Sequence, residues 1–194
     1  MIKKVQNEMV TALFNFVWMT VWREKGFEFE FSDRHLGRYL AVTPQGEAVG
    51  TAEIKPYRPG ESALDSVAPF ERHERVAADP AKVAEIDKIA LLKAHRGAYL
   101  SELLTVAVGF ARANGYHYYL SLLEPVFYRA LRITYRIPME KAGDAAFYKG
   151  DTVIPVVFDM KAMYERPENY DWLRLDTLED NELAARTELA LTKS

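Results

Sequence analysis

Residues 85–104 read EIDKIALLKAHRGAYLSELL, and the interpretation of the whole chain starts from this stretch. Its first part belongs to an apolar run (83–92) typical of a buried strand, although three charged residues lie near the start of that run. Its second part opens a helical pattern (97–115) that closes with Asn114-Gly115. The apolar stripe of this predicted helix consists of Leu100, Leu103, Leu104, Ala107, Val108 and Ala111. The stretch therefore predicts a central strand, a basic loop KAHRG and a helix.

The sequence before this unit predicts a helix, a hairpin and a long loop. Residues 8–23 have helical periodicity, with Met9, Leu13, Phe16 or Val17, and Val21 on one face. Residues 27–36 fit either a short strand or an ordered loop. Two strands at 38–43 and 48–55 flank the turn Pro44-Gln45-Gly46. Residues 56–80 are rich in Pro, Gly, Ser and charge, which predicts a long mobile loop with at most one helical turn.

The sequence after it predicts a strand at 116–123, a short helix within 124–138 and two extended segments, 137–148 and 152–159. Pro155 favours an edge or a bulge over a paired central position. A last helix is predicted from Thr177, with Asp180 in the capping-box position. A strand–helix–strand unit needs parallel pairing and hairpins need antiparallel pairing, so the order predicts an α+β protein with a mixed central sheet flanked by helices. We expect one domain, divided into an N-terminal helix and loop (1–36), a core (37–160) and a C-terminal helical extension (161–194).

Composition excludes several classes of function. The 194 residues carry a formal net charge of −3, which provides no basic field for nucleic acid. The chain has no cysteine, so disulfides and cysteine-based sites are excluded. The histidines (His35, His73, His95 and His117) lack metal-ligand spacing, and no metal site is expected.

The first 22 residues have a basic start and then an apolar run, but no small-residue cleavage site follows, and the run from Met9 to Trp22 is too short to span a bilayer. We therefore expect a cytoplasmic protein without a transmembrane segment. Contact of Phe14, Trp18 and Trp22 with a lipid surface is the alternative.

The order of elements, together with the segment Arg96-Gly97-Ala98-Tyr99-Leu100-Ser101, resembles the GNAT N-acyltransferase superfamily over about residues 5–160. Family members read approximately Arg-Gly-x-Gly-x-Gly/Ala before the corresponding helix. Arg96 and Gly97 match that pattern, whereas Tyr99 and Ser101 stand where small residues are usual.

A narrower resemblance is to the acyl-homoserine-lactone (autoinducer) synthases and the bacterial N-acyl amino acid synthases. It is carried by Arg23, Phe27, Asp33 and Arg38-Tyr39-Leu40, and by Glu85-Ile86-Asp87-Lys88-Ile89 in place of Glu-x-Ser-Arg-aromatic. The chain has Glu53-Ile54-Lys55-Pro56 where those enzymes have Arg-Leu-x-Pro. These departures indicate a relative with another acyl acceptor.

Acyl transfer to an amine needs a base, a polarised thioester carbonyl and an acid for the thiolate. Glu85 is the candidate base, because apolar neighbours on its strand would raise its pKa. The competing interpretation is a strand-end carboxylate paired with Lys88 or an arginine. Asp87 shares its face and would assist the base or hold the acceptor ammonium, whereas Lys88 would point to the other face as a surface residue.

The resemblance implies the other site residues. The donor, acetyl-CoA or a longer acyl-CoA, or an acyl carrier protein, would lie along the central strand, with its pyrophosphate at the basic loop. The residues expected to bind it are Ile89, Ala90, Leu91, His95, Arg96, Gly97, Ala98 and Tyr99. Tyr128 would protonate the thiolate, and Arg23, Asp87 and Tyr148 would contact a small amine or amino-acid-like acceptor.

Two functions follow from this sequence. The first is an N-acyltransferase, and the second is a catalytically inactive ligand-binding or interaction module with the same fold. The late strands and the long loop could form a homodimer contact.

Overall fold

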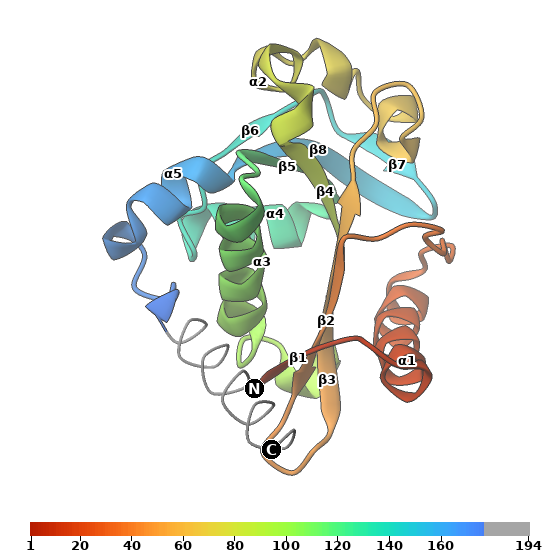
Figure 1. Cartoon of the computed structure of the whole chain (residues 1–194). Coiled ribbons are helices and arrows are strands. Elements are labelled where there is room, and N and C mark those ends of the chain that lie inside the picture. The colour runs from red at the N-terminus through yellow and green to blue at the C-terminus, as the bar shows by residue number, and fades with distance from the viewer. Residues whose placement is uncertain (177–194) are drawn as a thin grey trace.

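The computed structural model describes residues 1–176, and its strands form one mixed sheet in the order β1-β2-β3-β4-β5-β8-β6, with β7 paired to β8 beside β6 (Figure 1). The strands are β1 (Ile2–Lys4), β2 (Gly37–Val42), β3 (Ala48–Pro56), β4 (Val83–Leu91), β5 (Tyr118–Leu123), β6 (Met139–Lys141), β7 (Ala146–Tyr148) and β8 (Asp151–Asp159). The helices are α1 (Glu8–Lys25), α2 (Glu74–Ala78), α3 (Leu100–Asn114), α4 (Pro125–Ile133) and α5 (Met160–Glu165). Short 3-10 turns are η1 (Ala63–Ser66), η2 (Phe70–Arg72), η3 (Pro80–Lys82), η4 (Lys93–His95) and η5 (Pro167–Asn169).

The pairing pattern confirms the predicted α+β class. β4 and β5 are parallel and are joined by α3, while the other recorded strand pairs are antiparallel. The predicted hairpin is present as β2 and β3. The predicted stripe of α3 is also correct, since all six of its residues are buried against the sheet.

Helix α1 covers one face of the sheet, and α3 and α5 lie on the other (Figure 1). The Asn7 side chain caps the start of α1 by accepting a hydrogen bond from Val10 N, and Gly26 ends the helix with a φ of 80°. Its buried face consists of Phe14, Val17, Trp18 and Val21, spaced as i, i+3, i+4 and i+7.

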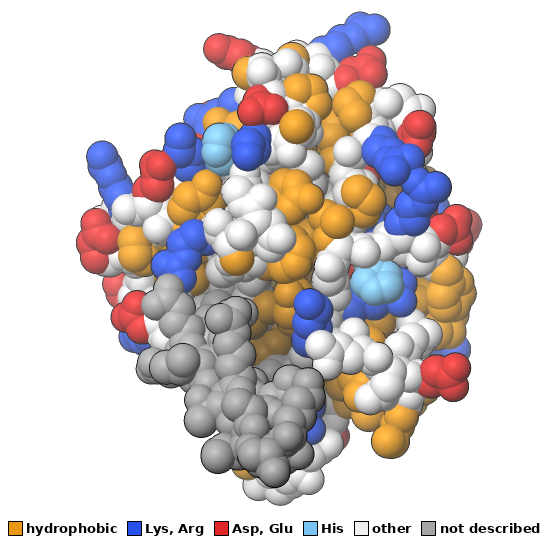
Figure 2. All heavy atoms as spheres, in the orientation of Figure 1, with side chains coloured by type: hydrophobic (Ala, Val, Ile, Leu, Met, Phe, Trp, Pro, Cys, Tyr) orange, Lys and Arg blue, Asp and Glu red, His pale blue; other side chains and the backbone are white. Residues whose placement is uncertain are grey.

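The predicted face of α1 is therefore correct for Val17 and Val21 and wrong for its other members. Met9, Leu13 and Phe16 are exposed, and hydrophobic side chains are visible at the surface in the region of α1 (Figure 2). Of the three large residues considered above for lipid contact, Phe14 and Trp18 have no exposed surface and Trp22 is partly buried. The predicted face and the observed face both have helical spacing, so spacing alone does not distinguish them. The packing of α1 against the sheet does. Within residues 1–176, no helix combines the length and apolarity that a membrane crossing requires.

The segment between β3 and β4 is ordered rather than mobile. It contains η1, η2, α2 and η3, and it buries Leu64, Phe70 and Val76 with Val83 and Leu120 of the sheet. These few apolar residues fix the segment against the sheet, although the segment is mostly polar. Its polar composition therefore led to the wrong prediction of a mobile loop. Residues 27–36 form a loop, which is one of the two predicted alternatives.

The structure adds β1 near the N-terminus and α5 after β8, neither of which the sequence predicted, and it corrects the position of Pro155. This proline lies in β8, paired with Leu122 of β5, and β8 also pairs with β6 and β7 on its other side. Pro155 is tolerated because the β6 pairing stops at Val156 and the β7 pairing stops at Val153. The helix predicted from Thr177 lies outside the described residues.

Candidate active site

The parallel strands β4 and β5 separate halfway along their length. Pairing is recorded only between Val83–Glu85 and Tyr118–Leu120, so the backbone of β4 after Glu85 has no strand partner on that side within residues 1–176. A cavity of about 520 Å³ occupies the opening, and its walls include the segment Glu85–Leu91. Its size falls in the range of small-molecule sites, and its lining is mostly apolar. The separation of the two strands therefore makes a ligand-sized space at the centre of the sheet.

A β-bulge shapes the wall of this cavity. Thr51 pairs with Ala90 and Glu53 pairs with Asp87, so one residue of β3 faces two residues of β4. Lys88, one of the two, has a φ of 49°, in the left-handed region that residues other than glycine rarely adopt. Its carbonyl accepts a hydrogen bond of 2.7 Å from Thr51 Oγ1, which fixes the bulge. Such a bulge redirects the backbone and side chains beyond it.

Glu85 lies at the point where the strands separate. Its side chain is buried, and it accepts a hydrogen bond of 2.6 Å from Ser62 Oγ. Lys55 Nζ lies 3.2 Å from its other oxygen. Burial raises the pKa of the Glu85 carboxyl, and the Lys55 ammonium and the Ser62 hydroxyl partly offset that rise. Glu85 is therefore paired with Lys55 and not with Lys88, which was the partner considered from the sequence.

Lys55 bridges the two carboxylates that the sequence placed on one face. Its Nζ lies 3.1 Å from Asp87 Oδ2 as well as 3.2 Å from Glu85 Oε2. Burial alone would lower the pKa of Lys55, but Asp87 and Glu85 outweigh it and raise that pKa. Burial would raise the pKa of Asp87, but Lys55 and Lys88 outweigh it and lower that pKa. This wall therefore holds the Lys55 ammonium between the carboxyl groups of Asp87 and Glu85.

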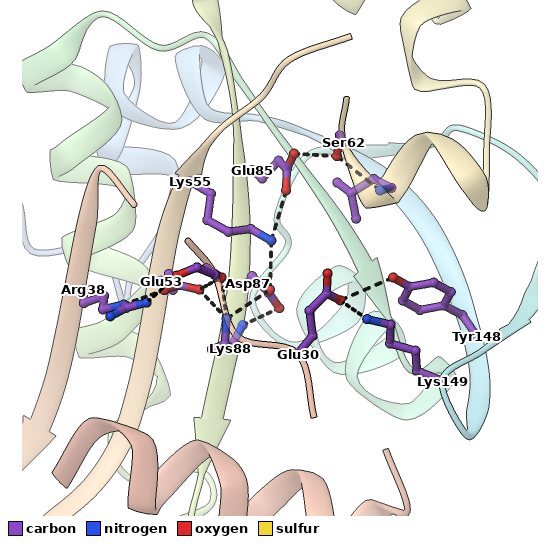
Figure 3. Close-up of polar contacts among 12 residues, drawn as sticks. Glu30, Arg38, Glu53, Lys55, Ser62, Glu85, Asp87, Lys88, Tyr148 and Lys149 are labelled. Carbon is purple, nitrogen blue, oxygen red and sulfur yellow. Dashed lines mark hydrogen bonds and ion pairs between the residues drawn. The ribbon is translucent and has the colours of Figure 1, made fainter. Parts of the chain in front are cut away.

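Lys88 is not a surface residue, which corrects the prediction from strand alternation. Its side chain is 1% exposed, it forms an ion pair with Glu53 Oε2, and it donates a hydrogen bond of 2.7 Å to Ser32 Oγ. Its ammonium also lies 5.3 Å from the ring centre of Trp18. Arg38 Nε lies 2.5 Å from the second oxygen of Glu53. The bulge breaks the two-residue alternation, so this lysine points into the protein (Figure 3).

The wall across the cavity carries a second polar group, formed by Glu30, Tyr148 and Lys149 (Figure 3). Glu30 Oε2 is paired with Lys149 Nζ and accepts a 3.3 Å hydrogen bond from Tyr148 Oη. Glu30 and Lys149 were missed by the sequence analysis, because nothing local marks a loop residue and a turn residue as neighbours. Burial raises the pKa of Tyr148, and the nearby Glu30 carboxylate adds to that rise.

The basic loop lies at the end of β4, before the start of α3. Arg96 and Gly97 line the cavity, and Arg96 Nη2 makes an exposed 3.1 Å contact with Glu24. Gly97 has a φ of 91° with no atom near the position of a Cβ, which leaves open space above its backbone. No side chain caps the first turn of α3, so its amide groups are available to an anion.

The predicted site residues divide into two groups. Those that line the cavity are Glu85, Asp87, Ile89, Ala90, Leu91, Arg96, Gly97 and Tyr148. Those outside the lining are Arg23, His95, Ala98, Tyr99 and Tyr128. The guanidinium of Arg23 lies 5.7 Å from the Phe29 ring centre.

Two tyrosines near the end of the cavity differ in their surroundings. Tyr128 Oη accepts a hydrogen bond of 3.0 Å from Arg132, and Tyr128 does not line the cavity. Tyr135, just after α4, does line it, and burial raises the pKa of its hydroxyl. A tyrosine that stays protonated is suited to donating a proton. The family resemblance implied Tyr128, which lies within α4, whereas Tyr135 follows the end of that helix.

Among residues 1–176, no group of three His, Cys, Asp or Glu side chains is arranged to hold a metal ion.

Comparison with known proteins places these features in context. The model of the acetyltransferase (GNAT) family matches residues 5–132. A search of curated proteins found no match. FeeM, an N-acyl amino acid synthase from uncultured soil microbes, is similar in structure with a TM-score of 0.67 at 12% identity, over 83% of this chain and 91% of that chain.

Two acyl-homoserine lactone synthases are also similar in structure. LasI has a TM-score of 0.58 at 14% identity, over 82% of this chain and 88% of that chain. BjaI, a CoA-dependent enzyme solved with SAM and isopentyl-CoA, has a TM-score of 0.54 at 16% identity, over 88% of this chain and 78% of that chain. At these identities the likeness establishes a shared fold.

Proposed function

Because this chain belongs to the acetyltransferase (GNAT) family, whose model matches residues 5–132, we propose that it is an acyl-CoA-dependent N-acyltransferase acting on a small amine. The observation that carries the proposal is Glu85, a buried carboxylate with a raised pKa at the point where β4 and β5 separate. A base at that point would face both substrates, because the cavity reaches the open edge of β4 on one side and the polar wall of Glu30 on the other.

In the proposed reaction the acceptor nitrogen attacks the thioester carbonyl carbon. Glu85 takes the ammonium or amine proton, the C–N bond forms and the C–S bond breaks. The backbone of β4 beyond Glu85 has no strand partner on the β5 side, and its N–H groups there would bind the carbonyl oxygen. The N–H of Lys88 is not among them, because it donates a 2.7 Å hydrogen bond to Asp87 Oδ1. We assign protonation of the departing thiolate to Tyr135, which lines the cavity, with Tyr128 as the alternative.

The donor site is proposed at the end of β4. Arg96, Gly97 and the first turn of α3 would hold the pyrophosphate. The positive charge of Arg96 and the uncapped backbone amides of α3 both favour binding of an anion there. The apolar lining from α4 and β5, which includes Leu122, Phe127 and Ala130, has room for an acyl chain longer than acetyl. The expected co-substrate is therefore a longer acyl-CoA, with acetyl-CoA or an acyl carrier protein as the alternatives.

The acceptor would lie between the wall of Asp87 and the wall of Glu30 and Tyr148. Both walls carry charges of both signs, because Lys55 lies beside Asp87 and Lys149 beside Glu30. This arrangement supports an amino-acid-like acceptor, with a carboxylate as well as an amine.

Ligand-induced stabilisation tests the donor site. A ligand at one hundred times its dissociation constant stabilises the folded state by about 2.7 kcal/mol, which is visible as a rise in melting temperature. We expect a larger rise with a long-chain acyl-CoA than with acetyl-CoA. No rise with either would favour a carrier-protein donor or the inactive module, and adding acylated carrier protein separates these two.

Substitution of the base tests the chemistry. Glu85→Gln keeps the size of the side chain and removes the base, so turnover should fall by about a hundredfold or more while the acyl-CoA-induced melting shift persists. Normal turnover in this variant would show that Glu85 is not the base.

A further inference from the structure

Six charged side chains form an unbroken line across three strands, and we refer to it as the ion-pair chain (Figure 3). In order, its members are Arg38 on β2, Glu53 on β3, Lys88 and Asp87 on β4, Lys55 on β3 and Glu85 on β4. Charges alternate along it. Lys88 Nζ is paired with Glu53 and lies 3.6 Å from Asp87 Oδ2. Lys55 Nζ lies 3.1 Å from Asp87 Oδ2, which precedes it in this order, and 3.2 Å from Glu85 Oε2, which follows it.

The far end of this chain lies outside the cavity. Arg38 and Glu53 are absent from its lining, and the Glu53 side chain has no exposed surface. A fully buried carboxylate is costly unless it is paired on both oxygens, and Arg38 and Lys88 each take one. Neither a substrate nor solvent reaches Glu53, so its charge acts only on its protein neighbours.

Three of these residues stand where the sequence departs from the enzymes that it resembles, and one of them is Asp87, in place of a serine. Glu53 replaces an arginine and Lys88 replaces another, and in this structure the two replacements pair with each other. The pair also lies at the bulge, since Lys88 has the positive φ and Glu53 is opposite Asp87. The departures therefore form one connected unit.

We propose that Glu53 is a positioning residue for acyl transfer, acting on the carboxylate of Glu85 through the ion-pair chain. Glu53 holds the Lys88 ammonium, so Asp87 stays paired mainly with Lys55. Lys55 is then shared between Asp87 and Glu85, and the Glu85 carboxylate keeps a proton affinity suited to a base. The inference rests on the proposed function, because that function gives Glu85 its role.

The direction of each effect follows from charge. Without Glu53, Lys88 would neutralise Asp87, Lys55 would turn to Glu85, and one nearby negative charge would be lost. Both changes favour the ionised Glu85, so its pKa should fall. Without Arg38, Glu53 would hold Lys88 more tightly, Asp87 would draw Lys55 away, and the pKa of Glu85 should rise.

Other polar and charged groups also face Glu85 and stay unchanged in this test. Ser62 donates to it from the segment before η1, and Tyr57, which is paired with Asp65, lies near it. Across the cavity lie Glu30 and Lys149.

The experiment follows the titration of the Glu85 side-chain carboxyl by ¹³C NMR in the full chain, assigned with Glu85→Gln. Glu53→Gln should lower its midpoint by about 0.5–1 pH unit, and Arg38→Met should raise it by a similar amount. Arg38→Lys keeps the charge and is the matched control, with no expected shift. Where an acceptor is in hand, the acid limb of kcat/KM should move in the same directions.

Each variant is first checked for a cooperative melt. If Glu53→Gln does not fold, the Glu85 midpoints of Arg38→Met and Arg38→Lys are compared instead. Arg38 is at the partly exposed end of the ion-pair chain, so its replacement is better tolerated. Folded variants whose Glu85 midpoint equals that of the wild type would overturn the inference. Because the NMR readout needs no turnover, absence of acyl transfer in the wild type would count against the proposed function and not against the ion-pair chain.

Discussion

Replacing Lys55 by methionine should change both the pH dependence and the stability of this protein. Lys55 Nζ lies 3.2 Å from Glu85 and 3.1 Å from Asp87, and its side chain is 15% exposed. At an effective dielectric constant of about 20, one such contact is worth about 5 kcal/mol before desolvation is subtracted. Lys55→Met removes two contacts and leaves two carboxylates facing each other.

One of the two carboxylates should then bind a proton. Burial already raises the pKa of Glu85, whereas Lys88 still favours ionised Asp87, so Glu85 is the group that should protonate. We expect the acid limb of kcat/KM to move up by about one pH unit or more, which is about a tenfold loss of activity at pH values below the new limb. Initial rates measured over the pH range 5–9 with saturating acyl-CoA test this.

Stability should change with pH in a defined direction. In the variant, folded Glu85 has a pKa above its unfolded value, so the folded state binds more protons and unfolding becomes easier as pH rises through that pKa. The variant should therefore lose about 2–3 kcal/mol of unfolding free energy near pH 8 and less near pH 5. Lys55→Arg keeps the charge and is the control. An acid limb that stays in place, with a stability loss independent of pH, would refute the assignment of Lys55 and Glu85 as partners.

Two further predictions concern the leaving group and the cavity wall. Tyr135→Phe should lower kcat by about a hundredfold with little change in acyl-CoA binding, whereas Tyr128→Phe should leave kcat nearly unchanged, and steady-state kinetics of both variants decide which tyrosine is the acid. Gly150→Ala places a methyl group 2.2 Å from Gly26 O at a φ of 104°, so it should cost about 2–3 kcal/mol and several degrees in melting temperature. Gly60→Ala has a φ of 76° with open space around it and should cost less, and equal melting temperatures for the two variants would contradict the close contact between the segment after α1 and the turn before β8.

Several parts of the candidate site were predictable from sequence. Glu85 and Asp87 line the cavity as expected, and Arg96 and Gly97 lie between β4 and α3. These residues belong to one continuous strand–loop–helix segment, so their spacing along the chain determines where they lie relative to one another. For the same reason the apolar stripe of α3 was predicted correctly.

Other parts depended on contacts between distant segments. Lys88 was predicted to be at the surface, yet it pairs with Glu53, 35 residues away, because of a bulge that exists only once β3 and β4 are in register. Glu30 and Lys149, 119 residues apart, gave no local signal of their pairing. The buried face of α1 likewise depended on which side chains fitted the sheet.

The sequence by itself determined the order of the central elements (α1, β2, β3, β4, α3, β5 and α4) and the presence of acidic residues and a basic loop on the central strand–helix unit, because hydrophobic periodicity and loop chemistry are local. The tertiary structure alone decided where β4 and β5 separate, which way the charges of β4 point and which partners each carboxylate has. Those features arise from strand register and from burial, which combine residues far apart in the chain, and they set the ionisation of Glu85 on which the proposed chemistry depends.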